Sequence, residues 1–349
     1  MRFEQRESTP LAFGILVPAG AFVLSFVICA AVIAWSGVSP LTAYWHIFFG
    51  ALGSKFAITE TLTRTTPLIF TGLAVAVAFR ARLWNIGAEG QLYVGAVVTI
   101  ALGSGLLDLP GFVLIPILIV CGFIAGALLF LGPAILKVQL GVDEVVTTLL
   151  LNFIIILLVS ALLDGPMKDP MAMGWPQSPP VLESARLPVL VHASRLHLGL
   201  VLALIVVAVV WTLNVRTTWG FEMKAIGANL TASEFAGIPI NAAVMRVAFI
   251  SGGLAGIAGV VEVIGVKGDL TLDLSPGYGY SGIVVAMLAA LHPLAVVPAA
   301  VFVAGIFVGA DAMSRAMTVS SYIAEVITAV SLLCMLVATL FLRYRVRWT

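Results

Sequence analysis

The polar residues best able to do chemistry lie in one short stretch (79–91) between two long apolar runs. The stretch carries two arginines, two amides, one carboxylate and two glycines: Arg80, Arg82, Asn85, Gln91, Glu89, Gly87 and Gly90. Because charges are costly inside a membrane, such a group marks either a membrane surface or a functional site. We therefore treat Asn85, Glu89 and Gln91 as candidates for a solute path or its gate.

Two interpretations of these three residues stay open. Glu89 stands near the expected cytoplasmic start of a helix, at the end of the bundle, where free amide groups and the helix dipole favour a carboxylate with or without a gating role. Asn85 and Gln91 can offer paired donors and acceptors to a polar solute, or they can tie two helices together. The adjacent glycines permit tight helix contacts or a break in the helix.

Three further polar residues, Asn152, Glu262 and Glu325, lie within apolar runs. Polar side chains in membrane spans usually face the interior of the helix bundle, so we expect these three there and count them with the candidate path. Asp143 and Glu144 precede another apolar run and are better explained as charges at a helix N-terminus than as paired catalytic acids.

Features of catalysis are not found in the sequence. The four histidines show no metal-ligand spacing. There is no phosphate-binding loop of the Gly-x-x-x-x-Gly-Lys-Ser/Thr type and no evident pairing of a nucleophile with a base. We therefore expect no catalytic residue, no metal and no resident cofactor, and any use of ATP must take place on another chain.

Composition places the chain in a membrane. Of its 349 residues, 61% are apolar and 10% are charged, and the mean hydropathy is +1.13. Soluble domains carry about 25% charged residues, so most of this chain must face lipid or other apolar helices. A net charge of +1 argues against a nucleic-acid partner. Cys29, Cys121 and Cys334 all lie in apolar runs and are explained as small core residues.

A membrane-spanning helix needs about 20 apolar residues. The first run is too long for a removable signal and is expected to be an uncleaved helix. Residues 41–52, rich in aromatic side chains, are expected to form a helix lying at the outer membrane interface. Ten spans are expected, the eighth being short: 11–35, 59–79, 86–106, 111–136, 144–163, 198–215, 241–264, 279–291, 294–312 and 321–342.

The distribution of lysine and arginine favours both termini in the cytoplasm, as an even number of spans requires. Residues 164–197 then form an external loop, in which six prolines exclude a long helix but allow a short helical piece. Residues 216–240 form a cytoplasmic loop. Small residues four apart, at Gly252 and Gly256 and at Ala255 and Gly259, predict close helix packing.

The cytoplasmic loop contains a predicted helix of about two turns. Thr231 and Glu234 have the spacing of a capping box, and Gly237 and Pro239 end the helix. Leu230 and Phe235 are then available for docking. Both an ordinary loop helix and a coupling helix that inserts into an ATPase subunit fit this pattern.

Three motifs resemble ABC importer permeases of the ribose and branched-chain amino acid superfamily. Residues 225–229, followed by Ala232, Ala236, Gly237 and Ile238, resemble its conserved cytoplasmic loop. Residues 85–91 resemble the nucleoside-type branch, whose binding proteins are basic-membrane-protein-like lipoproteins. Residues 277–288 provide a third match, and the resemblance covers nearly the whole chain from Leu11 onward.

The resemblance implies an all-helical bundle of the vitamin-B12-type (type II-like) importers, forming one transmembrane domain over 1–349 in the inner (plasma) membrane. The implied partners are a cytoplasmic ABC ATPase, a second permease subunit, identical or different, and an extracytoplasmic solute-binding protein that docks on 164–197. The implied substrate is a nucleoside or a simple sugar, which is moved but not chemically changed. The implied coupling residues are Gly227, Asn229, Leu230, Thr231, Glu234, Phe235 and Gly237.

Two other classes of function remain open. A secondary transporter driven by an ion gradient would also use helices broken at glycines, and this chain alone would then be active in proteoliposomes. A membrane-embedded enzyme would need acid, base or metal-binding groups clustered at one depth, and the sequence does not indicate such a cluster.

Overall fold

The computed structural model describes residues 2–5, 11–35 and 37–347. Their contacts divide the chain into two compact units. We call residues 62–300 the central unit, and residues 1–61 with 301–349 the terminal unit. All of the candidate polar residues except Glu325 belong to the central unit.

A helix forms at each of the ten predicted spans, but two of these helices are too short to cross a membrane alone. They are α4 (Ala88–Gly103) and α11 (Tyr278–Leu288). Among the described residues seven helices are long and apolar enough to cross, and α1 with α2 makes an eighth if that bent pair is one span. The described residues therefore show fewer complete spans than the ten predicted, because α4 has only 16 residues and α11 only 11. The other helices are α1 (Leu11–Trp35), α2 (Pro40–Leu52), α3 (Lys55–Arg80), α5 (Gly111–Leu140), α6 (Glu144–Asp164), α7 (Gly199–Arg216), α8 (Thr218–Ala228), α9 (Leu230–Phe235), α10 (Ile240–Glu262), α12 (Pro293–Met317) and α13 (Ser321–Arg343).

In the terminal unit α1 packs along α13, and their buried contact includes Cys29, Ile33 and Ile327. The burial of Cys29 and Cys334 agrees with their interpretation as core residues, whereas Cys121 in the central unit is only partly buried. The chain bends by 117° between α1 and α2. Short strands β1 (Arg2–Gln5) and β2 (Tyr344–Arg347) pair in antiparallel register, a feature that the all-helical prediction lacked.

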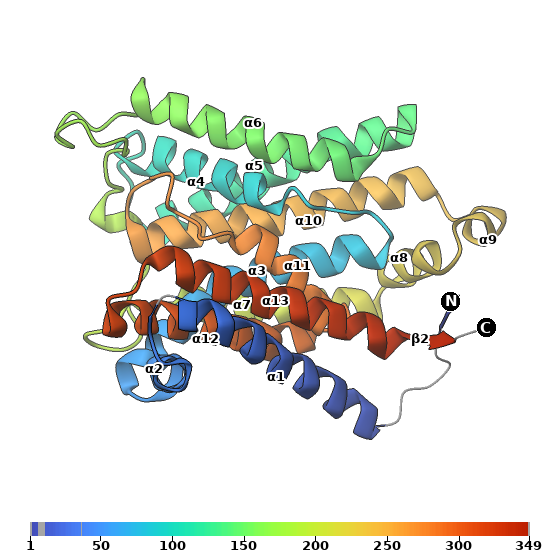
Figure 1. The fold of residues 1–349 in the computed structure, drawn as a ribbon. Helices are drawn as coiled ribbons and strands as arrows, with labels where there is room; N and C mark the ends of the chain where they lie inside the picture. Colours follow the sequence, from blue (N-terminus) through green and yellow to red (C-terminus); the bar gives the residue numbers. More distant parts are fainter. Residues whose placement is uncertain (1, 6–10, 36, 348–349) are drawn as a thin grey trace. The chain divides into compact units, whose positions relative to one another are not determined.

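In the central unit α10 runs alongside α4 and α5 (Figure 1), and α3 and α10 are its most buried long helices. In each of these helices 89% of the membrane-crossing window is buried, against 28% in α5 and 22% in α6 and in α7. The outer helices present large apolar side chains on their surfaces, such as Leu149, Phe153 and Leu157 of α6. This is the pattern of a bundle whose outer surface is covered by lipid or by another apolar protein surface.

Small residues let α10 approach its neighbours closely, as their spacing predicted. A Cβ atom on Gly256 would lie 2.2 Å from the carbonyl oxygen of Gly122 in α5, and one on Gly259 would lie 1.9 Å from that of Leu92 in α4. No side chain fits at either position unless the helix backbones move apart. The packing of α4, α5 and α10 therefore depends on these glycines.

The loop at 165–198 is ordered and contains one short helical piece, η1 (Glu183–Ala185), as predicted. Ser178 anchors it: its N–H donates to the Leu270 carbonyl oxygen, and its Oγ accepts from the Leu270 N–H, at 3.0 and 2.8 Å. Buried His197 ends the loop, and its Nδ1 accepts the N–H of Gly199 at 3.1 Å. Burial lowers the pKa of His197 to about 4, so its ring is neutral at physiological pH.

The packing of α10 gives a matched pair of glycine substitutions. Gly256→Ala should lower the free energy of unfolding by about 1–3 kcal/mol, because the added methyl group overpacks the α5–α10 contact. Gly132→Ala on α5 has no atom within 4 Å of its new Cβ, so it should be neutral or stabilising by up to about 1 kcal/mol through helix propensity. Denaturant unfolding of both purified variants measures this, and equal effects would contradict the described packing.

Candidate functional site

The chain turns sharply at the end of α3. The N–H groups of Ala81 and Leu83 both donate to the carbonyl oxygen of Ala78, and Arg82 between them has a φ of 54°. This left-handed residue closes the helix end in the way that glycine often does. Trp84 follows, and its N–H donates to Glu144 Oε1 at 3.1 Å at the start of α6.

From Trp84 the chain runs into the bundle as non-helical backbone before α4 begins at Ala88. The depth of this entry is given by α6: the Gly90 N–H donates to Asn152 Oδ1 at 2.8 Å. Asn152 is eight residues beyond Glu144, which is about 12 Å along a helix axis. Glu89 therefore begins a helix, as predicted, but not at the end of the bundle as expected. The expectation failed because residues 81–87 do not continue a helix and carry the chain inward instead.

Asn85 holds the entering segment in place. It is fully buried, and its amide exchanges two hydrogen bonds of 2.9 Å with the amide of Gln91. Its Nδ2 also donates to Ser251 Oγ of α10 at 2.9 Å, and Ser251 in turn donates to the Ala74 carbonyl oxygen of α3 at 2.7 Å. In this structure the two amides tie α3, α4 and α10 together.

Glu89 lies where the N-termini of the two short helices meet. Its Oε2 accepts the N–H of Gly279, in the first turn of α11, at 2.6 Å. The approach is so close that a Cβ on Gly279 would lie 2.2 Å from the Glu89 nitrogen. Both helix N-termini carry positive partial charge, so a carboxylate placed between them is stabilised. Glu89 is only 3% exposed, which differs from the surface setting considered from the sequence.

Asn152 connects α6 to both short helices. Besides accepting from Gly90, it donates from Nδ2 to the Ile86 carbonyl oxygen at 2.9 Å and to the Tyr280 hydroxyl at 3.2 Å. Asn152 is fully buried. We call the five residues Asn85, Glu89, Gln91, Asn152 and Ser251 the polar node. Ser251 was not predicted as a member, since a serine among glycines in an apolar run carries little signal.

The other two intramembrane carboxylates lie elsewhere. Glu262 is buried, as expected, but it ends α10 eleven residues beyond Ser251, about 16 Å along the helix. Glu325 belongs to the terminal unit and is exposed, so the prediction that it faces the bundle interior was wrong. The reason is its place in the helix: α13 begins at Ser321, and Glu325 is only the fifth residue.

The start of α6 also does more than predicted. Asp143 caps the helix as expected, accepting the Val145 N–H at 2.8 Å. Glu144, explained from the sequence only as a helix-terminal charge, is buried and forms an ion pair with Lys137. Because it also accepts from Trp84, it fixes the point where the chain enters the bundle.

The loop at 216–240 contains two helices rather than one. The longer, α8, was missed because glycines at 220 and 227 weaken the helical signal. The shorter, α9, begins at Leu230 and is capped by Asn229, whose Oδ1 accepts the Ala232 N–H at 3.0 Å. The predicted capping box at Thr231 and Glu234 was therefore wrong, because Asn229, a favoured capping residue, starts the helix earlier.

The end of α9 agrees with the prediction. Gly237 has a φ of +79°, and its N–H donates to the Glu234 carbonyl oxygen at 2.9 Å. Phe235 is 96% exposed and Leu230 is 52% exposed, so both are free to dock. The junction of α8 and α9 lies on the end of α3, since a Cβ on Gly227 would come within 2.0 Å of the Arg80 carbonyl oxygen. Arg82 Nη2 also lies 3.5 Å from the Ala228 carbonyl oxygen.

Comparison with known proteins gives a consistent result. Residues 57–340 match the family described as branched-chain amino acid transport system, permease component. The chain is 34% identical to the guanosine ABC transporter permease protein NupP of Bacillus subtilis, over 91% of this chain and 92% of that protein.

Two further relatives also match over most of their length. The glucose ABC transporter permease protein TsgB13 of Haloferax volcanii is 32% identical over 99% of this chain and 93% of its own length. The nucleoside ABC transporter permease protein NupB of Lactococcus lactis is 32% identical over 86% of this chain and 85% of its own length. No solved structure matches the chain significantly.

The polar node gives a stability prediction. Asn152→Ala should lower the free energy of unfolding by about 1–3 kcal/mol, because it leaves the Gly90 N–H and the Ile86 carbonyl oxygen buried without this partner. The control is Thr212→Ala on exposed α7, which removes only a hydrogen bond within its own helix, to the Ala208 carbonyl oxygen. It should change the free energy of unfolding by less than about 0.5 kcal/mol. Denaturant unfolding in detergent compares them. A cost for Asn152→Ala no larger than that of the control would show that the node is not a stabilising centre.

Proposed function

We propose that this chain, which belongs to the family of permease components of branched-chain amino acid transport systems, carries a nucleoside. A simple sugar is the second candidate. As an ABC permease component it is a non-catalytic, multi-pass membrane subunit for nucleoside or sugar import. The observation that carries the choice of substrate is the similarity over nearly the whole chain to relatives named for guanosine and for nucleosides. The glucose permease among the relatives supports the second candidate.

The subunit would work with three partners. A cytoplasmic ABC ATPase supplies the energy and receives α9, whose exposed Phe235 and Leu230 suit a groove. An extracytoplasmic solute-binding protein delivers the solute at the loop 164–197. A second permease subunit, identical or different, completes the path, and the lightly buried outer helices offer apolar surface to it and to lipid.

The polar node is the proposed gate. It joins the N-termini of two short helices to α3, α6 and α10 inside the bundle, so a shift in any of these helices must rearrange its hydrogen bonds. Movement of α9 on ATP binding reaches the same region, because the α8–α9 junction rests on the end of α3. Opening the node on alternate sides would then let the solute pass without chemical change.

An ion-driven secondary transporter is the second candidate, since two broken helices that meet inside a bundle also form the sites of such proteins. That mechanism predicts gradient-driven uptake by this chain alone in proteoliposomes. The ABC assignment predicts uptake only with the ATPase present. Family membership favours the latter.

The docking role of α9 is tested by removing its exposed aromatic side chain. Phe235→Ser should abolish both the stimulation of ATP hydrolysis by the loaded binding protein and solute uptake in the reconstituted complex, while the protein stays folded. Phe112→Ser is the control, because Phe112 is also highly exposed, at 81%, but lies at the start of α5. Wild-type stimulation and uptake in Phe235→Ser would exclude α9 as the docking element.

The gating role is tested at Glu89. Glu89→Gln keeps the size of the side chain and an oxygen to accept the Gly279 N–H, but it removes the charge between the two helix N-termini. We expect an assembled complex that hydrolyses ATP with little uptake. Uptake and ATPase assays on one preparation decide this. An unchanged ratio of solute moved to ATP consumed would show that Glu89 has only a structural role.

A further inference from the structure

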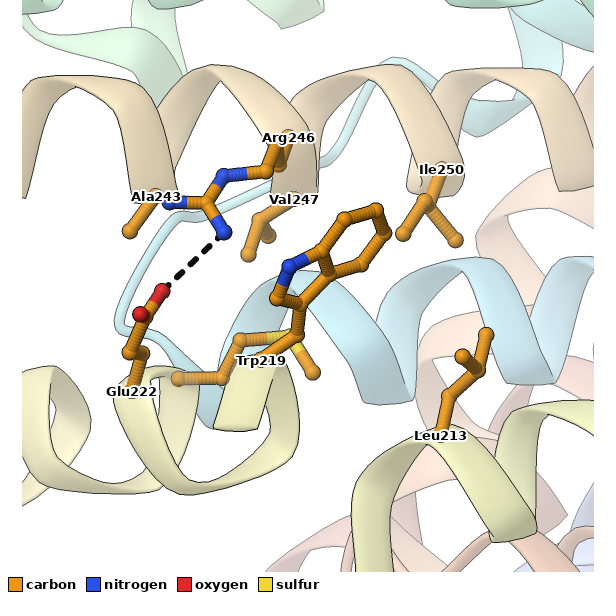
Figure 2. A pocket seen from close by; sticks show the side chains of 8 residues that line it. Leu213, Trp219, Glu222, Ala243, Arg246, Val247 and Ile250 are labelled. Atoms are coloured by element: carbon orange, nitrogen blue, oxygen red, sulfur yellow. Dashed lines mark ion pairs between the residues drawn. The ribbon is translucent and has the colours of Figure 1, made fainter. Parts of the chain in front are cut away.

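A charged cluster outside the polar node joins α8 to α10 (Figure 2). Glu222 Oε2 of α8 lies 3.1 Å from Arg246 Nη1 of α10. The Arg246 guanidinium also lies over the ring of Trp219 on α8, 5.3 Å from its centroid. We call Trp219, Glu222 and Arg246 the α8–α10 clamp.

The surroundings of the clamp fix the orientation of its charged side chains and keep them partly buried. Arg246 Nε donates to the Ala242 carbonyl oxygen of its own helix at 3.2 Å, which orients the guanidinium. The side chains of Arg246 and Glu222 are only 31% and 21% exposed, so water screens their attraction less than on an open surface.

Beside the clamp a small gap remains between the two helices. A small open hollow lies there, with largely apolar walls that include Leu213, Met223 and Ile250. Apolar side chains such as Met223 and Val247 pack around this hollow, and the clamp adds the charged, specific link between α8 and α10.

The clamp lies between the proposed docking helix and the polar node. On one side α8 leads through Asn229 directly into α9. On the other side Arg246 precedes Ser251 of the node by five residues on the same helix, about 7.5 Å along its axis. A movement of α9 that pulls α8 would therefore act on α10 close to the hydrogen bonds of Asn85.

We propose that the α8–α10 clamp transmits the movement of α9 to α10 and thereby to the polar node, with Glu222 and Arg246 as positioning residues for transport. The inference rests on the proposed function of α9. Without the clamp, α8 and α9 would follow the ATPase while α10 stays behind. ATP would then be consumed without solute being moved.

The first test is the ratio of nucleoside uptake to ATP hydrolysis in the reconstituted complex. Glu222→Gln and Arg246→Gln should each lower this ratio by about fivefold or more, while ATP hydrolysis stays near the wild-type rate. The double variant should be no worse than either single variant, since both remove the same contact. Arg246→Lys, which keeps the positive charge, should restore part of the ratio. Lys224→Gln, which removes an exposed charge from the same helix, should leave the ratio unchanged.

Two results would overturn the clamp. One is a parallel fall of uptake and ATP hydrolysis with an unchanged ratio, which a merely structural contact would give. The other is a wild-type ratio in all variants. Failure of the wild-type complex to take up any nucleoside or sugar would instead refute the proposed function. In that case the clamp is tested by a second measurement that needs no solute.

That readout is the distance between spin labels on Ala236→Cys, after α9, and Phe249→Cys, on α10, in a background without the three native cysteines. With the clamp intact, addition of ATP and vanadate to the complex should leave this distance unchanged, because α9 and α10 move together. In Arg246→Gln the distance should change. The same response in both proteins would refute transmission through the clamp.

Discussion

The central constraint on this structure is that two helices begin inside an apolar bundle. The first N–H groups of any helix have no partner within it, and inside a membrane water cannot supply one. Here Glu89 accepts from the start of α11, and Asn152 accepts from the start of α4. Glu89 and Asn152 are thus required by the backbone of the two short helices, and any function of the node builds on that requirement.

This constraint also explains why the glycines cluster where they do. The two helix starts can meet only because Gly279 has no side chain to collide with Glu89. The helices around them approach closely for the same reason, with Gly256 against α5 and Gly259 against α4. A bundle packed this way has little freedom within itself, so a movement arriving from α8 and α9 is transmitted rather than absorbed.

Much of this could be predicted from the sequence, because apolar length and charge carry the membrane signal directly. A helix at each predicted span, the loop with its short helical piece, the stop at Gly237 and the grouping of Asn85, Glu89 and Gln91 all follow from local patterns, whereas α8 was missed. The predictions that failed concern contacts between residues that are distant in the sequence. The inward path of residues 81–87 is set by Glu144, Asn152 and Ser251, and Glu222 and Arg246 are 24 residues apart with no motif to join them.

The most direct test of the central claim is hydrogen–deuterium exchange of the intact protein in a lipid nanodisc. Residues 85–91 and 277–279 include non-helical backbone, which in a surface loop would exchange quickly. Because the N–H groups of Gly87, Gly90 and Gly279 are buried and donate to side chains of the node, we predict that they exchange far more slowly than those in the exposed turn around Met171 and Met173. Exchange as fast as in that turn would contradict the account, since residues 85–91 would then lie at the surface and not inside the bundle.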